Sequence, residues 1–349
     1  MISSDNLDKI KSIISNETFL ERYGSTWLID SFYLFLITPS AYIGLILNLL
    51  NIFIFTKIAH QQTTVLYKYL IVYCINNEVL CLLACISFYV YTSRYLGVKL
   101  DYFARICYCV MINWICVTLY FFGNLLDIII SIERLSIFVK NLKWFTQLNF
   151  LIVCLVTFLF SIFVNIPTYL RIYVKTDNET YNDLFKILDD VNNITFSTCG
   201  QGLLYKNYIL IGLNIFIRDI VSLMSEIVLS IFILKKFREY KSNRSILINN
   251  KDQSTNEQKN KDNHVKLTSM TIYLSLLAII SHTTLCLVFA FFYVENIIFQ
   301  SYLALISYSA IFLKHAYSFF IFYYFNNNFK KSFLDLIKRK NVKVNVLKT

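Results

Sequence analysis

Proline, glycine and charged side chains are all scarce in this sequence. Its 349 residues include 2 prolines and 7 glycines, and charged residues make up only 16%. So little glycine and proline excludes a collagen-like or low-complexity chain and flexible interdomain linkers. The hydrophobic share is 56% and the mean hydropathy is +0.54. A soluble domain could not bury so much apolar surface, so the sequence predicts a protein embedded in a lipid bilayer.

Catalytic motifs are missing as well. We find no paired nucleophile and base, no metal-ligand spacing and no phosphate-binding loop in the chain. The sequence therefore predicts no enzyme, no metal site and no cofactor.

Seven apolar stretches are each long enough to cross a bilayer, which takes about 20 residues. They lack the alternation of barrel strands, so we expect helices. The predicted fold class is an all-α membrane protein. It has an N-terminal segment at 1–31, a seven-transmembrane helix bundle at 32–325, and an amphipathic eighth helix with the tail at 326–349. The predicted spans are Phe32–Thr56, Tyr69–Tyr91, Phe103–Ile132, Leu148–Leu170, Tyr208–Leu234, Leu267–Val294 and Ile297–Phe325.

The distribution of basic residues predicts the orientation, because Lys and Arg favour the cytoplasmic side. With the N-terminus outside, 20 Lys and Arg fall in cytoplasmic segments and 10 in extracellular ones. We therefore expect a multi-pass plasma-membrane protein with an extracellular N-terminus and a cytoplasmic C-terminus. The net charge of +11 then reflects topology and attraction to membrane lipids, and predicts no nucleic-acid partner.

Glycosylation acceptors agree with this orientation. Asn-x-Thr triplets begin at Asn16, Asn178 and Asn193, all in predicted extracellular segments. A fourth triplet, at Asn243, falls in a predicted cytoplasmic loop and should be unmodified.

Short motifs along the chain carry a family resemblance. The third span ends in Ser131-Ile132-Glu133-Arg134-Leu135, with Cys109 25 residues before Arg134 and a loop cysteine, Cys199, further on. This set resembles the rhodopsin-like G-protein-coupled receptors, over roughly residues 32 to 339. Further matches to the same family are Gly44 to Asn48, Asn76 to Leu80, Ser318 to Phe322 and Asn326 to Phe333.

Departures mark a divergent member. Ser318, Phe319 and Phe322 replace the Asn, Pro and Tyr of the family's seventh helix, and Ser281 to Thr284 replaces its Cys-Trp-x-Pro. The composition is similar to invertebrate peptide and chemosensory receptors.

The resemblance implies several roles. Glu133 would hold Arg134 at rest and release it to a heterotrimeric G protein, although Arg134 could instead be a snorkelling anchor. A disulfide would join Cys109 to Cys199; Cys107 is the less favoured partner. In the membrane interior we expect a polar network in which Lys314 pairs with Glu78, with Asp127 as a second partner. The alternative is that Glu78 is protonated and Lys314 reaches water. The full predicted network is Asn48, Glu78, Asp127, Lys314 and Ser318.

The predicted ligand pocket is a set placed by position in the family, and its members could equally be packing residues. Cys116 stands where amine receptors keep an Asp, which disfavours a biogenic amine. The acidic loop after the fourth span favours a cationic peptide as the extracellular ligand. The pocket residues are Cys116, Tyr120, His282, Phe289 and Tyr308.

Three further expectations complete the sequence interpretation. A membrane transporter or channel is the alternative function, because intramembrane charges could mark a polar path.

Residues 235–266 are polar, and we expect a disordered loop there. Residues 326–339 should form an interfacial helix with Phe329 and Phe333 on its apolar face. The charges of the alternative path are Glu78, Asp127, Arg218, Asp219, Glu226 and Lys314.

Overall fold

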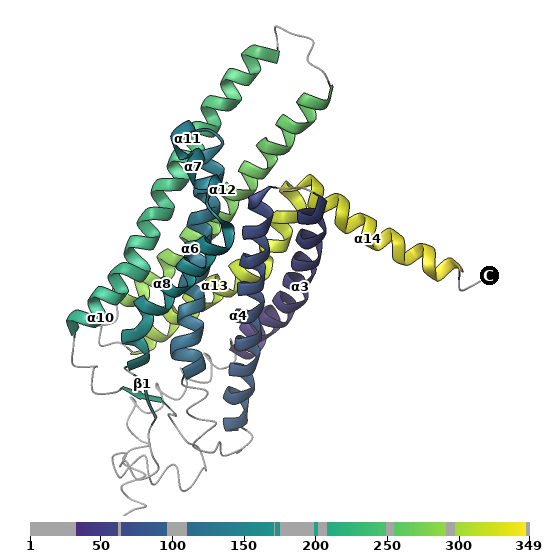
Figure 1. Ribbon diagram of the computed structural model, residues 1–349. Helices are drawn as coiled ribbons and strands as arrows, with labels where there is room; N and C mark the ends of the chain where they lie inside the picture. The colour runs from purple at the N-terminus through teal and green to yellow at the C-terminus, as the bar shows by residue number, and fades with distance from the viewer. Residues whose placement is uncertain are drawn as a thin grey trace, which may run out of the picture.

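The computed structural model describes residues 33–61, 64–95, 110–170, 172–174, 199–201, 208–248, 255–290 and 297–346. Nearly all of them are helical, and the long helices lie side by side in a bundle (Figure 1). In chain order the elements are η1 (Tyr33–Ile37), α3 (Thr38–Gln61), α4 (Val65–Tyr95), η2 (Met111–Ile115), α6 (Cys116–Ser136), η3 (Lys140–Leu142), α7 (Lys143–Gln147), α8 (Phe150–Leu170), β1 (Ile172–Val174), β2 (Cys199–Gln201), α10 (Tyr208–Ile215), η5 (Phe216–Val221), α11 (Ser222–Ile248), α12 (Thr255–Ala290), α13 (Ile297–Phe325) and α14 (Asn327–Val346).

Among the described residues, six helices are long and apolar enough to cross a membrane, which confirms the helical fold class and agrees with a membrane-embedded chain. They are the spans at Phe35–Gln61, Val65–Ile86, Cys116–Ser136, Phe150–Tyr169, Val265–Leu287 and Leu305–Phe325. The predicted fifth span, in α10, η5 and α11, is helical but is interrupted by the π-helical turn η5, which carries Arg218 and Asp219.

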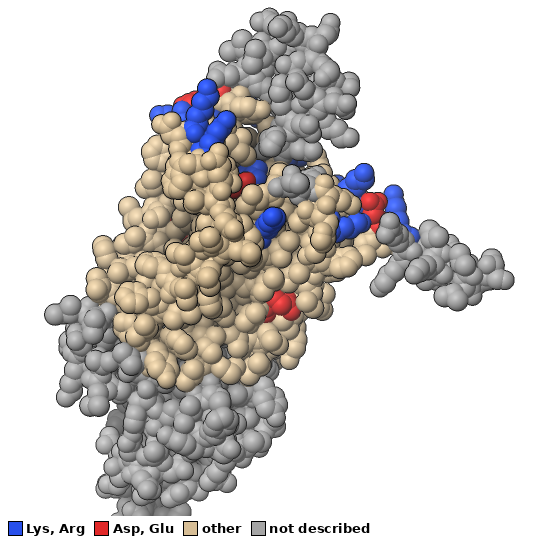
Figure 2. Space-filling view, in the orientation of Figure 1, with Lys and Arg blue, Asp and Glu red and all other residues tan. Residues whose placement is uncertain are grey.

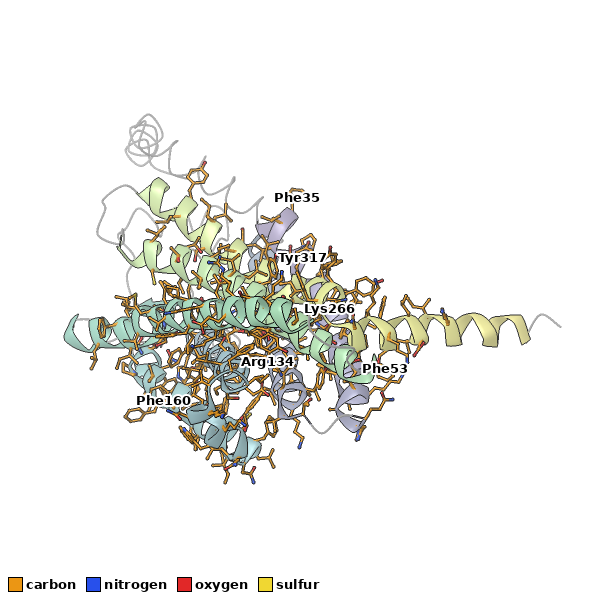
Figure 3. All side chains as sticks on the ribbon, turned by 90° about the horizontal axis from the view of Figure 1, so that it is seen from above. Phe35, Phe53, Arg134, Phe160, Lys266 and Tyr317 are labelled. Atoms are coloured by element: carbon orange, nitrogen blue, oxygen red, sulfur yellow. The ribbon has the colours of Figure 1, made fainter. Side chains whose placement is uncertain are left out.

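The outer faces of these helices suit lipid rather than water. Leu151 and Phe163 on α8 are 69% and 70% exposed, and α3 exposes Ile46 and Phe53 in the same way. From the end of the bundle, Phe53 and Phe160 lie at its margin while Arg134 lies near its middle (Figure 3). Large apolar side chains therefore cover the outside, and polar ones are turned inward.

The central helix is α6, which packs against α4, α8, α11 and α12. Its residues Phe122, Leu126, Ile129 and Ile130 join a core with inward side chains of α3, α4, α12 and α13. The same core includes Phe329 of α14.

Basic residues are concentrated at one end of the described part of the bundle. Basic side chains gather towards the end where α11, α12 and α14 project, and the middle of the visible face is almost uncharged (Figure 2). The two short strands lie at the opposite end (Figure 1), paired antiparallel with Val174 opposite Cys199.

The expectation of a disordered loop at 235–266 is wrong for most of that segment. α11 continues to Ile248, and α12 starts at Thr255. Good helix formers such as Lys and Glu extend the helices, and Lys236 pairs with Glu239 three residues later at 2.7 Å. The exposed Glu239 accepts this hydrogen bond from Lys236, which lowers the pKa of its carboxyl group.

The last helix, α14, runs sideways from the bundle (Figure 1). The side chain of Asn326 accepts hydrogen bonds from the backbone N–H groups of Asn328 and Phe329, which caps the helix start. Phe329 is fully buried and contacts the rings of Phe55 and Phe319.

Candidate functional site

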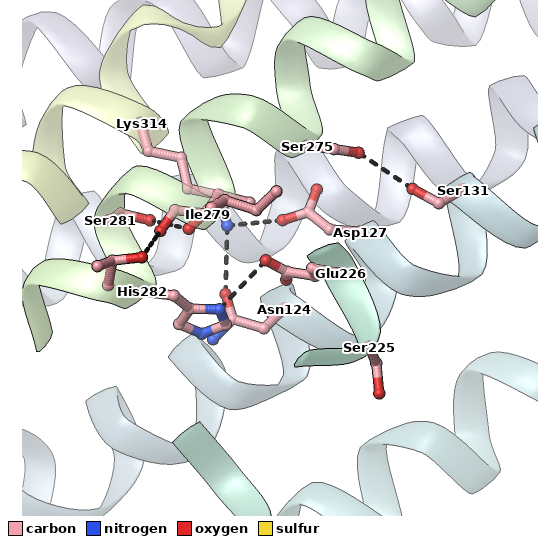
Figure 4. A network of polar contacts seen from close by, with 12 residues as sticks. Asn124, Asp127, Ser131, Ser225, Glu226, Ser275, Ile279, Ser281, His282 and Lys314 are labelled. Atoms are coloured by element: carbon pink, nitrogen blue, oxygen red, sulfur yellow. Dashed lines mark hydrogen bonds and ion pairs between the residues drawn. The ribbon is translucent and has the colours of Figure 1, made fainter. Parts of the chain in front are cut away.

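A buried ion pair links α6 to α13 in the middle of the bundle. Nζ of Lys314 lies 2.6 Å from Oδ2 of Asp127, and the two side chains are 1% and 3% exposed. Lys314 also donates a hydrogen bond to Oδ1 of Asn124, at 3.2 Å (Figure 4). Asn124 and Asp127 are three residues apart, so both project from the same face of α6.

The prediction that Lys314 pairs with Glu78 is wrong, and only the second partner, Asp127, is in place. Glu78 is partly exposed, and its Oε2 has no hydrogen-bond partner among the described residues. Its neighbour Asn77 is the α4 residue that faces α13, where it bonds to Nδ1 of His315 at 2.8 Å. Adjacent helix residues point about 100° apart, which turns Glu78 away from Lys314.

The two other members of the predicted network gather around the backbone of α13. Nδ2 of Asn48 donates to the carbonyl oxygen of His315 at 3.1 Å, and Oγ of Ser318 donates to the same oxygen at 3.5 Å. Asn48 thus ties α3 to α13, whereas the bond of Ser318 stays within α13; Asn51 is bonded to Asn48 at 3.5 Å.

A second buried acid–base contact joins α11 to α12. Nδ1 of His282 lies 3.2 Å from Oε2 of Glu226, and the side chains are 0% and 2% exposed. The ring of Tyr120 meets His282 edge-on at a centroid distance of 5.4 Å. Tyr120 and His282, two of the predicted pocket residues, are therefore in contact.

The π-helical turn η5 holds a third pair. Arg218 binds Asp219 through Nε and Nη2, the latter at 2.7 Å, and both residues are buried. Nη1 of Arg218 also lies 3.5 Å from Oδ1 of Asn214, one turn earlier. A π-helical turn is wider than an α-helical turn, so the consecutive residues Arg218 and Asp219 both point into the interior of the bundle. The turn η5 contains no proline.

At the basic end, polar contacts continue along α6. Oγ of Ser131 lies 3.2 Å from Oγ of Ser275 on α12 (Figure 4). One turn further, Nε of Arg134 lies 2.9 Å from Oε2 of Glu133, and both side chains are buried.

A cavity of about 320 Å³ opens just beyond this pair. It lies where the end of α6 meets α11 and α12. In its wall the rings of Phe138 and Tyr240 contact each other, with 5.6 Å between their centroids. Its lining combines apolar and charged side chains: Ile137, Phe138, Lys236, Phe237, Glu239, Tyr240 and Val265.

Other predicted residues are less fully placed. Cys116 opens α6 as a partly buried free thiol. The side chains of Phe289 and Tyr308 lie outside the described residues, as do Cys109, Asn16, Asn178 and Asn193. Cys199 is the first residue of β2. Because its predicted partner Cys109 lies outside the described residues, the Cys109–Cys199 disulfide stays a prediction.

Sequence reasoning gave no role to Asn124, Asn77 and His315, and it treated Glu226 only as part of an alternative path. Two signals could have found them. Asn124 precedes Asp127 by three residues on one helical face, and Glu226 and His315 are ionisable residues within apolar runs.

Comparison with known proteins adds no family assignment, because no family model and no curated protein sequence matches the chain.

Proposed function

We propose that the chain is a receptor of the rhodopsin-like, G-protein-coupled type, which transmits the binding of an extracellular ligand to a heterotrimeric G protein. On this proposal α10, η5 and α11 together form a seventh membrane span. The charges in η5 do not prevent this, because Arg218 and Asp219 neutralise each other inside the bundle.

The observation that carries the proposal is the cavity beside the Glu133–Arg134 pair. The pair ends α6, the cavity begins within one turn of it, and basic residues surround that end of the bundle. A segment of a G-protein α subunit could enter between α6, α11 and α12, with apolar side chains against Phe138 and Tyr240. Release of Arg134 from Glu133 would give the incoming segment a hydrogen-bond donor.

The proposed orientation puts this end in the cytoplasm of a plasma-membrane protein. The concentration of Lys and Arg there supports it, because positive residues are retained on the cytoplasmic side. α14, with Phe329 anchored in the bundle and Lys330 and Lys331 beside it, would lie in the lipid headgroup region as an eighth helix.

The ligand would enter from the opposite end. Cys116 and Tyr120 lie in the first two turns of α6, and Tyr120 contacts His282 of α12. On this proposal these residues belong to the ligand pocket, and the glycosylation and disulfide residues lie on the same side of the membrane. A cationic peptide fits the excess of acidic residues in the loop after α8.

The direct experiment is nucleotide exchange on G proteins in membranes that contain the chain. We expect exchange above that of empty membranes for at least one α-subunit class, and its loss in Arg134→Leu at equal expression. Exchange equal to that of empty membranes for every class, with and without a library of peptides and small molecules, would contradict the proposal.

A transporter or channel is the second candidate, because ionisable residues extend through the bundle from η5 to α13. These groups contact one another in pairs, which favours a structural network over a water-lined path. Ion or substrate flux into proteoliposomes without any G protein would support this alternative.

A further inference from the structure

One acid lies towards the outside of the bundle at mid-membrane depth. Glu78 is partly exposed, whereas Asp127 and Glu133, the other acids of the six described spans, are buried. Ten residues separate Glu78 from Lys68, an exposed residue near the start of the same span. That length of α-helix covers about 15 Å, and the hydrocarbon core is about 30 Å thick. With Lys68 at the membrane surface, Glu78 therefore lies close to the middle of the bilayer.

The neighbours of Glu78 on α4 show which way its side chain faces. Cys81, three residues later, packs against α3, where Nδ2 of Asn48 lies 3.9 Å from its Sγ. Ile75 and Leu82, three residues before Glu78 and four after it, are 46% and 48% exposed. Glu78 therefore lies at the edge between the contact with α3 and the lipid-facing side of α4.

The carboxyl group of Glu78 has no partner among the described residues. Its Oε2 is buried without a hydrogen bond, and no ion pair joins the group to a described Lys or Arg. A charged group within the membrane is costly and is normally paired there. Protonation would remove the charge, but it would still leave polar oxygens without hydrogen bonds in lipid. A partner from outside the chain would remove both costs.

We propose that this side of α4 docks a membrane-spanning helix of another protein that carries a Lys or Arg near its centre. The cation would neutralise Glu78 and donate a hydrogen bond to its carboxylate. Ile75, Leu82 and Ile86, all exposed, would supply apolar contacts on either side of the ion pair. Together with Glu78 they are spaced by three, four and four residues, which makes one continuous stripe along a helix.

A second copy of the chain does not supply the required cation. The Lys and Arg residues that lie deep in the described helices are Arg134, Arg218 and Lys314, and all three are buried. Two copies that met across a two-fold axis at this face would bring Glu78 against Glu78, which places like charges together. Charge complementarity therefore favours a cationic helix from a different protein. This docking does not depend on coupling to a G protein.

The test uses the full-length chain in phosphatidylcholine vesicles with a synthetic probe. The probe is a leucine–alanine helix of about 20 residues with one central Lys, and its matched control has a central Leu. Energy transfer from a fluorescent amino acid at Tyr324, which is 77% exposed, to a dye on the probe measures association. We expect the wild type to bind the Lys helix about tenfold more tightly than the Leu helix.

Variants of the chain assign this preference to one residue. Glu78→Gln should bind the Lys and Leu helices equally, and Glu78→Lys should prefer a probe with a central Glu instead. Asp335→Asn, which removes an acid on α14, is the matched control and should keep the tenfold preference. A preference for the Lys helix that survives in Glu78→Gln would overturn the proposal.

A second measurement uses the wild type alone. When the Lys of the probe is moved seven residues towards one end, about 10 Å along the helix, the binding should fall to that of the Leu helix. Equal binding of the central-Lys and Leu helices, or of the central and displaced Lys, would contradict an ion pair at the depth of Glu78. Energy transfer between two labelled copies of the chain that Glu78→Gln abolishes would also overturn the proposal, because a second copy would then occupy this face.

Discussion

Lys314 on α13 meets Asp127 on α6, with 2.6 Å between Nζ and Oδ2, inside a bundle whose outer surface is apolar. Neither charge could persist alone at that depth without a large desolvation cost. The pair therefore fixes the distance between two helices that are far apart in sequence.

Removing one partner of this pair should destabilise the protein. We expect Asp127→Asn to cost about 3–5 kcal/mol, because it leaves Lys314 charged and unpaired, and Asp127→Leu/Lys314→Met to recover much of that loss. Thermal melting in nanodiscs measures both. Glu78→Gln is the matched control and should change stability little; if it were as damaging as Asp127→Asn, the assignment of Asp127 as the partner would be wrong.

The ion pair at the end of α6 should restrain signalling. Glu133→Gln removes the negative charge 2.9 Å from Nε of Arg134 and should raise basal nucleotide exchange roughly fivefold, the effect of about 1 kcal/mol on a two-state balance. Asp335→Asn, which removes one acid on α14 outside the lining of the cavity, should leave basal exchange within about twofold. Equal exchange by the wild type and Glu133→Gln at matched surface expression would remove this role.

The anchor of α14 should contribute strongly to stability. Phe329 is 0% exposed and is surrounded by the rings of Phe55, Phe319 and Phe322, so Phe329→Ala should cost about 3–5 kcal/mol. Ile337→Ala, at a 44% exposed position of the same helix, should cost far less. Comparable melting temperatures for the two variants would show that α14 is not held through Phe329.

Two glycines should respond oppositely to the same change. A Cβ at Gly44 would lie 2.7 Å from Sγ of Cys81 and 3.3 Å from Cβ of Ala316, so Gly44→Ala should destabilise by about 1–3 kcal/mol. A Cβ at Gly212 meets nothing within 4 Å, and Gly212→Ala should be neutral or stabilising by up to about 1 kcal/mol. Equal effects in chemical denaturation would contradict the close approach of α3 to α4 and α13.

The helical fold could be predicted from the sequence because continuous apolar runs of this length have few alternatives in lipid. The partner of Lys314 could not, because the motif match located Glu78 on α4 without determining which face it occupies; Asn77 takes the inward position instead. The contact of Glu226 with His282 depends on how α11 rotates against α12, and the turn η5 changes that rotation without a proline to mark it. The helical extensions of α11 and α12 do not follow from composition, because the same polar residues occur in disordered loops and in exposed helices.

The most direct test of the receptor proposal is photocrosslinking from the cavity to a G protein. A photoreactive amino acid at Tyr240, in the cavity wall, should form a covalent adduct with the α subunit in nucleotide-free membranes, and added GTP should reduce the yield. The same group at Phe163, 70% exposed on the outer face of α8, should give none. Adducts of equal yield at both positions, or none at Tyr240 with any α-subunit class, would contradict the proposal that this cavity receives a G protein.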